Sequence, residues 1–168
     1  FTDFRVLTES PDGELTLGNY PAEIPVDNET EIVVALTNHD GHQQEYSVIV
    51  TAEQIINDDG SLTVIETTEV DRFDATLTDG QQVRQPQTLA LSSAGEYRIN
   101  YYLYVDDPPP EPSTDSAYRY AHLTTTVVNE ETTATAGESI GNESVSDGGT
   151  DSESAGNGSQ ITDNPVLE

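Results

Sequence analysis

The 168-residue sequence contains no cysteine, methionine, tryptophan or lysine, and these absences limit what the chain can be. Without cysteine there is no disulfide and no thiol nucleophile, and the redox compartment cannot be inferred from cysteine usage. A chain that lacks methionine and begins at Phe1 is expected to be an excised fragment, with Leu167 and Glu168 expected to be cloning residues. Apolar runs also stay well short of the roughly 18 residues that a membrane span needs, so spans of the parent protein are expected to lie outside this fragment.

Positive charge is scarce as well, because five arginines stand against 32 acidic residues and the formal net charge is −27. Such a surface repels phosphates, so neither nucleic-acid binding nor docking on anionic lipid is expected. Charge of one sign destabilises a compact fold, and molar salt relieves this repulsion by shortening the Debye length to about 3 Å. The excess of acid, the absence of lysine and the modest apolar fraction are typical of proteins from extreme halophiles. The alternative is an ordinary acidic protein with a disordered acidic tail.

The composition changes sharply after Val128. Residues 129–168 hold nine acidic residues and neither a basic nor an aromatic one. Such a segment buries too little apolar area to offset its conformational entropy, so it is predicted to be disordered. The expected organisation is one folded domain, residues 1–128, followed by a disordered acidic tail rich in serine, threonine and glycine, residues 129–168.

Within residues 1–128, apolar and polar residues alternate with a period of two, and turn residues separate the runs. Pro86 places its run at a sheet edge or a bulge, and residues 19–30 are rich in turn formers. Seven or eight strands in a segment of this length predict an all-β, antiparallel β-sandwich of immunoglobulin-like type. A jelly roll or a small barrel remains open. The predicted strands are residues 3–9, 31–38, 44–56, 62–77 (one or two strands), 81–91, 96–105 and 118–128.

The densest group of chemically versatile side chains is His39, Asp40 and His42. A structural zinc site needs four ligands in tetrahedral geometry, and the third histidine, His122, is remote in sequence. Asp40 and Gly41 form a turn pair between two predicted strands. The pattern therefore favours an exposed turn, with a weak metal site as the alternative.

A second acidic segment partly resembles a calcium-binding loop. Gly60 and Glu66 have the spacing of the sixth and twelfth EF-hand positions, and Asn57 and Asp59 match two earlier ones. The first ligand position would be Ile55, which cannot coordinate calcium, and the flanking segments are predicted strands. A hairpin turn over residues 57–61, with Asp59-Gly60 as its signal, is the favoured interpretation. No metal ligand, cofactor-binding residue or cofactor is therefore assigned.

Catalytic signatures are weak. There is no G-x-S-x-G elbow and no phosphate-cradling glycine loop, and acidic residues are too abundant for a carboxylate pair to be diagnostic. No catalytic residue is assigned.

The aromatic strand 96–105 carries Tyr97, Ile99 and Tyr101 on one face and Tyr102 and Tyr104 on the other. One face is expected in the core. The other, together with Tyr118 or Tyr120, either forms an exposed aromatic strip suited to sugars or proteins, or is covered by loops and neighbouring strands.

Three sequons place possible N-glycosylation sites at Asn28, Asn142 and Asn157. One lies in a predicted turn and two lie in the predicted tail, so all three are expected to be accessible. They would be used only if the domain lies outside the cell membrane.

Four stretches carry a family resemblance: VVALTNHDGHQQEYSVIV, LTDGQQV, AGEYRINYYLYVDDPP and AYRYAHL. In this order they resemble an uncharacterised haloarchaeal membrane-protein family, the domain-of-unknown-function family 1616, over residues 1–128. The resemblance implies membrane spans before a soluble immunoglobulin-like domain, and it implies no reaction and no site residue. The expected function is noncatalytic recognition or structural spacing on the extracytoplasmic face of the cell membrane. Its partner would be an envelope protein or glycan, and the fragment is expected to be a monomer. The alternatives are a carbohydrate-binding module and, less favoured, an enzyme.

Overall fold

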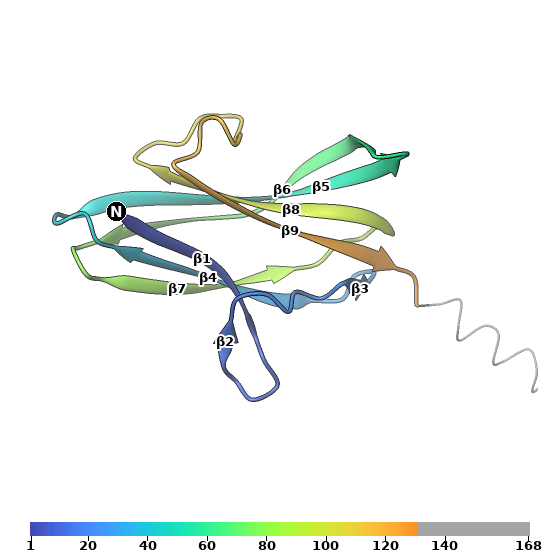
Figure 1. The fold of residues 1–168 in the computed structure, drawn as a ribbon, viewed down its shortest axis with the longest axis horizontal. Coiled ribbons are helices and arrows are strands. Elements are labelled where there is room, and N and C mark those ends of the chain that lie inside the picture. Colours follow the sequence, from blue (N-terminus) through green and yellow to red (C-terminus); the bar gives the residue numbers. More distant parts are fainter. Residues whose placement is uncertain (131–168) are drawn as a thin grey trace, which may run out of the picture. The chain divides into compact units, whose positions relative to one another are not determined.

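The structure is a computed structural model that describes residues 1–130. Nine strands form two facing sheets (Figure 1). The four-stranded sheet has the order β2-β1-β4-β7, and the five-stranded sheet has the order β3-β9-β8-β5-β6. The predicted all-β sandwich is confirmed. Its strands are β1 (Thr2–Glu9), β2 (Leu15–Thr16), β3 (Glu23–Pro25), β4 (Thr30–Asn38), β5 (Gln44–Asp58), β6 (Ser61–Leu77), β7 (Gln82–Leu89), β8 (Gly95–Val105) and β9 (Arg119–Val128).

The seven longer strands lie where the alternating pattern predicts them, and Pro86 lies in the edge strand β7. Two short strands were missed. β2 precedes the turn-rich segment 19–30 and β3 lies within it, and strands of two or three residues are too short to show an alternation. β3 pairs with β9 in parallel, whereas every other pair in residues 1–130 is antiparallel.

One apolar core fills the space between the sheets because alternate residues of each strand point inward. β4 departs from simple alternation, since every residue from Ile32 to Asn38 is buried. Its inner residues Ile32, Val34 and Leu36 belong to the core, whereas Val33 and Ala35 face outward and belong to a separate apolar cluster. Side chains on the outer face of the four-stranded sheet therefore shield the outward-facing residues of β4 from water.

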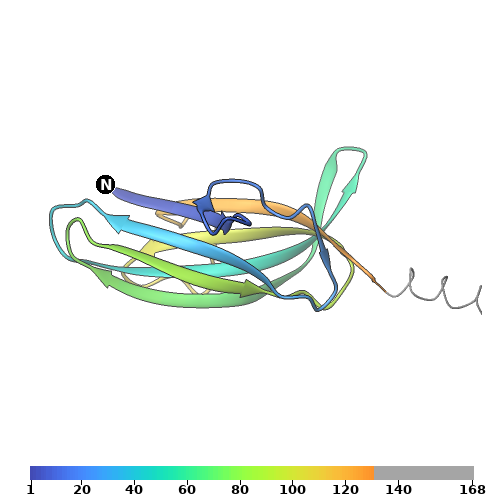
Figure 2. The same cartoon turned by 90° about the horizontal axis from the view of Figure 1, so that it is seen from below.

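The hairpin of β5 and β6 continues beyond its neighbours, and its end projects from the sandwich (Figure 2). Two register shifts, after Val50 and after Gln54, leave Val70 and Ile65 as extra residues on β6. Such bulges bend the strand and increase its twist, which turns the hairpin out of the sheet. We call residues 54–66 the wing. It carries four of the exposed large aliphatic side chains: Ile56, Leu62, Val64 and Ile65.

Asn129 and Glu130 are the only residues of the predicted tail that the structure describes. The remainder of that prediction, with Asn142, Asn157, Leu167 and Glu168, lies outside the described residues. Within residues 1–130, no helix has the length and hydropathy of a membrane span.

Candidate functional site

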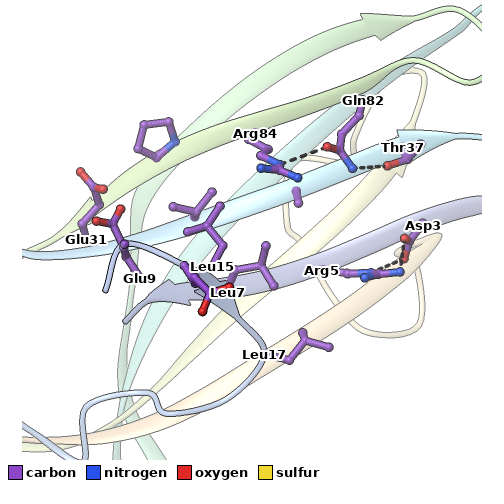
Figure 3. Close-up of a pocket in the computed structure, with 15 residues that line it drawn as sticks. Asp3, Arg5, Leu7, Glu9, Leu15, Leu17, Glu31, Thr37, Gln82 and Arg84 are labelled. Atoms are coloured by element: carbon purple, nitrogen blue, oxygen red, sulfur yellow. Dashed lines mark hydrogen bonds and ion pairs between the residues drawn. The ribbon is translucent and has the colours of Figure 1, made fainter. Parts of the chain in front are cut away.

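A groove of about 750 Å³ runs over the outer face of β1, β4 and β7 (Figure 3). The pairing of β1 and β7 with the two sides of β4 arranges its side chains in three cross-strand rows. We call it the outer groove. Its rows are Asp3, Thr37 and Gln82; then Arg5, Ala35 and Arg84; then Leu7, Val33 and Pro86. Glu9 and Glu31 lie beyond the third row, so the groove changes from polar to cationic to apolar to acidic along the strands.

The floor of the outer groove is apolar and closely packed. Leu7, Val33 and Ala35 are buried and form their own cluster, against which Leu15 packs from β2. Thr8 ties the base of this β1–β2 hairpin by donating a hydrogen bond from Oγ1 to the Gly18 carbonyl at 2.6 Å. Leu17, on the same segment, keeps 64% of its surface exposed at the groove wall. The hairpin thus forms one side of the groove, and its Leu15 helps to bury the cluster that contains Val33 and Ala35 of β4.

The two arginines of the middle row are held differently. Arg5 is bound side-on by its neighbour Asp3, with Nη2 2.7 Å and Nε 3.0 Å from the carboxylate oxygens. The hydrogen bond and the charge of Asp3 raise the pKa of the Arg5 guanidinium. Arg84 donates from Nε to Oε1 of Gln82 at 3.0 Å, and Gln82 donates from Nε2 to Thr37 Oγ1 at 2.9 Å. Arg84 forms no ion pair with any residue of 1–130, although this chain is strongly acidic.

The segment with His39, Asp40 and His42 is the connection between β4 and β5, as the turn interpretation predicts. The three side chains are used separately. His39 stacks on Phe1 at 4.7 Å between ring centroids, Asp40 binds the N-terminal ammonium at 2.7 Å, and His42 contacts Gln44 at 3.2 Å. His122 lies on β9, stacked on a tyrosine. Hydrogen bonds to the ammonium and to Thr2 lower the pKa of Asp40.

The Asn57–Asp59 segment is a tight hairpin turn, as predicted. Asp59 and Gly60 have φ angles of 50° and 88°, the left-handed values that a two-residue turn requires. The Asn57 side chain accepts a hydrogen bond from the Gly60 amide at 3.2 Å and so caps the turn. In residues 1–130 no group of three or more histidine, aspartate or glutamate side chains is placed to hold a metal ion.

Both faces of the aromatic strand β8 are covered. Tyr97 and Tyr101 lie in the main core, and Tyr102 and Tyr104 are buried in a cluster on the outer face. The proline-rich loop 106–118 covers Tyr104, whose hydroxyl accepts a hydrogen bond from the Ser113 amide at 3.1 Å, and Tyr120 of β9 packs against Tyr102. The covered alternative is therefore confirmed, and the exposed strip of Tyr102 and Tyr104 does not form.

The family of this chain follows from its sequence profile. A family described as a domain of unknown function, DUF1616, matches residues 1–126. The chain belongs to the DUF1616 family. A search of curated proteins gives no match.

Several solved structures resemble the DUF1616 domain at low sequence identity. The CARDB domain of a Pyrococcus furiosus protein, solved in complex with di-metal ions, is 18% identical, with a TM-score of 0.47; the match covers 77% of this chain and 96% of that one. A mutant β-glucosidase from Listeria innocua, in complex with laminaribiose, is 10% identical with a TM-score of 0.50, over 77% of this chain and 16% of the enzyme chain. The sporulation control protein Spo0M from Bacillus subtilis is 12% identical with a TM-score of 0.46, over 84% and 55%.

The remaining predicted positions are placed as follows in the DUF1616 domain. Asn28 is exposed in the turn between β3 and β4, where its backbone N–H donates to the Pro25 carbonyl at 3.1 Å. Asn142 and Asn157 lie outside the described residues.

The outer groove itself was not predicted. Its signal in the sequence is the run Asp3, Arg5, Leu7 and Glu9 at every second position, but the partner rows depend on strand order and register.

Proposed function

We propose that this DUF1616 domain is a noncatalytic recognition module that binds an envelope protein or glycan through the outer groove. The observation that carries the proposal is the groove itself, a concave surface with a buried floor of Leu7, Val33 and Ala35. Ligand sites combine such an apolar floor with a few polar groups that fix orientation, here supplied by Arg5 and Arg84. The fold itself does not determine a function, so the function has to be argued from a specific surface such as this groove.

The groove offers little to support an enzyme. Its acids Glu9 and Glu31 are exposed, so bulk water reaches both carboxylates. Enzymes place catalytic carboxylates where burial and excluded water tune them, and neither condition holds for this pair. The carbohydrate-binding alternative is tested by the same groove experiments, although the aromatic strip of Tyr102 and Tyr104 that favoured it is covered.

Filling the groove should abolish recognition. Ala35 lies between two long side chains with its Cβ toward the groove, so Ala35→Trp projects an indole into the binding space rather than into the core. Thr124→Trp is the matched control, because Thr124 is exposed on β9 of the opposite sheet. We expect immobilised wild-type and Thr124→Trp domains to retain the same envelope component saturably in molar KCl, and Ala35→Trp to lose at least tenfold in affinity. Equal retention by the two tryptophan variants would reject the groove as the recognition surface.

The proposal also places the domain on the extracytoplasmic face of a membrane-anchored parent protein. The absence of cysteine allows this to be tested with a single label, since Ser61→Cys introduces the only thiol of the chain at an exposed wing position. In intact cells expressing the parent protein, with any cysteine outside these 168 residues replaced by serine, a membrane-impermeant maleimide should label this cysteine as fully as it does after lysis. Labelling that appears only after lysis would place the domain in the cytoplasm.

A further inference from the structure

We propose that Arg5 and Arg84 form a carboxylate-binding cradle over Ala35, for a ligand with one carboxylate attached to an apolar segment. This inference rests on the proposed role of the outer groove and names the ligand chemistry that it selects. β1 and β7 flank β4, and the register sets Arg5, Ala35 and Arg84 side by side on one face. The two arginine backbones are thus about 10 Å apart. Ala35 is buried and forms the floor of this row, and Arg5 and Arg84 line the groove on its two sides (Figure 3).

Arg84 is oriented by hydrogen bonds, but it forms no ion pair within residues 1–130. Its Nε is occupied by Gln82, which Thr37 holds in turn, and this chain of hydrogen bonds fixes the plane of the guanidinium. Neither Nη group has a hydrogen-bond partner within residues 1–130. A planar guanidinium with both Nη groups available suits a carboxylate, which it can bind through two parallel hydrogen bonds. Arg5 binds Asp3 through Nε and Nη2, which leaves Nη1 without a hydrogen-bond partner within residues 1–130.

The neighbouring rows define the rest of the ligand. One row along the strands, about 7 Å away, lie Leu7, Val33 and Pro86, which can cover an aliphatic segment but offer no side-chain hydrogen bond. Beyond them, Glu9 and Glu31 repel a second negative charge. The groove therefore selects a monocarboxylate with an apolar body over a polyanion such as sulfate or phosphate.

Hexanoate is the direct probe, followed by amide shifts of the whole chain at the lowest KCl concentration that keeps it folded. We expect saturable shifts at Arg5, Ala35 and Arg84 with a dissociation constant on the order of 1 mM. Hexanol, which lacks the charge, and sulfate, which lacks the apolar body, should bind at least tenfold more weakly. The dipeptide acetyl-Ala-Leu, with a free or an amidated carboxyl terminus, distinguishes the two kinds of molecule that could supply the carboxylate. If the free acid binds more tightly than hexanoate, the ligand is a peptide carboxyl terminus. If it binds more weakly, the ligand is an aliphatic acid.

The variants separate the cradle from general electrostatics. Arg84→Gln should weaken hexanoate binding at least tenfold, and Ala35→Leu should do the same without a change in charge. Arg119→Gln is the matched control, because Arg119 also lacks an ion pair within residues 1–130 but lies on β9, and it should bind as wild type does. Equal losses in Arg84→Gln and Arg119→Gln, or no saturable shift in wild type, would overturn the cradle. If Ala35→Trp loses envelope retention while Arg84→Gln keeps it, the recognition role stands and the carboxylate assignment falls.

Discussion

Replacing Asn38 by leucine is expected to lower the free energy of unfolding by about 2–4 kcal/mol. Asn38 is fully buried at the end of β4, where its side chain joins two loops. Its Nδ2 donates to the carbonyls of His42 and Leu77, each at 2.8 Å, and its Oδ1 accepts from the Asp40 amide at 2.8 Å. Leucine fills a similar volume but leaves these backbone groups without their partners, and each buried polar group left unpaired costs about 1–3 kcal/mol.

Urea unfolding at fixed KCl measures this loss, with His42→Ala as the control. His42 lies in the same loop, is exposed, and contributes only its backbone carbonyl to Asn38. Its replacement should change the free energy of unfolding by less than about 0.5 kcal/mol. A loss in His42→Ala as large as that in Asn38→Leu would mean that the loop depends on the histidine side chains rather than on Asn38.

Lowering KCl from about 1 M to 0.1 M is expected to destabilise the domain by roughly 2 kcal/mol or more, a fall of several degrees in Tm. Within residues 1–130 the ion pairs involve only Asp3, Asp40, Glu53 and Glu69 as acids. The other acids of this part of the chain form no ion pair and repel one another. The Debye length falls from about 10 Å at 0.1 M salt to about 3 Å at 1 M, so most of the gain should be complete by 1 M.

A charge-reduced variant sharpens the salt experiment. Asp106 and Asp107 are exposed and lie near Glu45 and Asp74 at one rim of the five-stranded sheet. Asparagine tolerates the left-handed φ of 66° at Asp106, so the double change to asparagine keeps the turn. It should raise the Tm at 0.1 M KCl and flatten the salt dependence. Stability that is independent of salt in wild type would contradict both the self-repulsion account and the halophilic interpretation.

The sandwich could be predicted because its long strands alternate visibly. Tyr46, Val48 and Val50, for example, all enter the core as their period-two spacing implies. Turn chemistry was equally informative, since Asp59-Gly60 predicts the hairpin end where the structure has it. β3 could not be found this way, because its parallel pairing with β9 depends on contacts more than 100 residues away in sequence.

The outer groove could not be read from the sequence for a related reason. Arg5, Ala35 and Arg84 lie in separate strands, and only the order β1-β4-β7 and the register bring them into one row. A shift of one residue in either pairing would turn one arginine to the other face. The sequence also could not decide whether the outer tyrosines of β8 are exposed. Tyr104 is covered by the loop 106–118, and the prolines of this loop predict that it is rigid but not which face of the sheet it covers.

Amide chemical-shift mapping with a solubilised envelope fraction in molar KCl tests the recognition role of the groove most directly. The wing, with Ile56, Leu62, Val64 and Ile65 exposed, is the rival surface within the described residues. Recognition through the groove predicts shifts at Arg5, Leu7, Val33 and Ala35 that vanish in Ala35→Trp and persist in Thr124→Trp. Shifts confined to the wing, residues 54–66, with β1 and β4 unchanged, would contradict it.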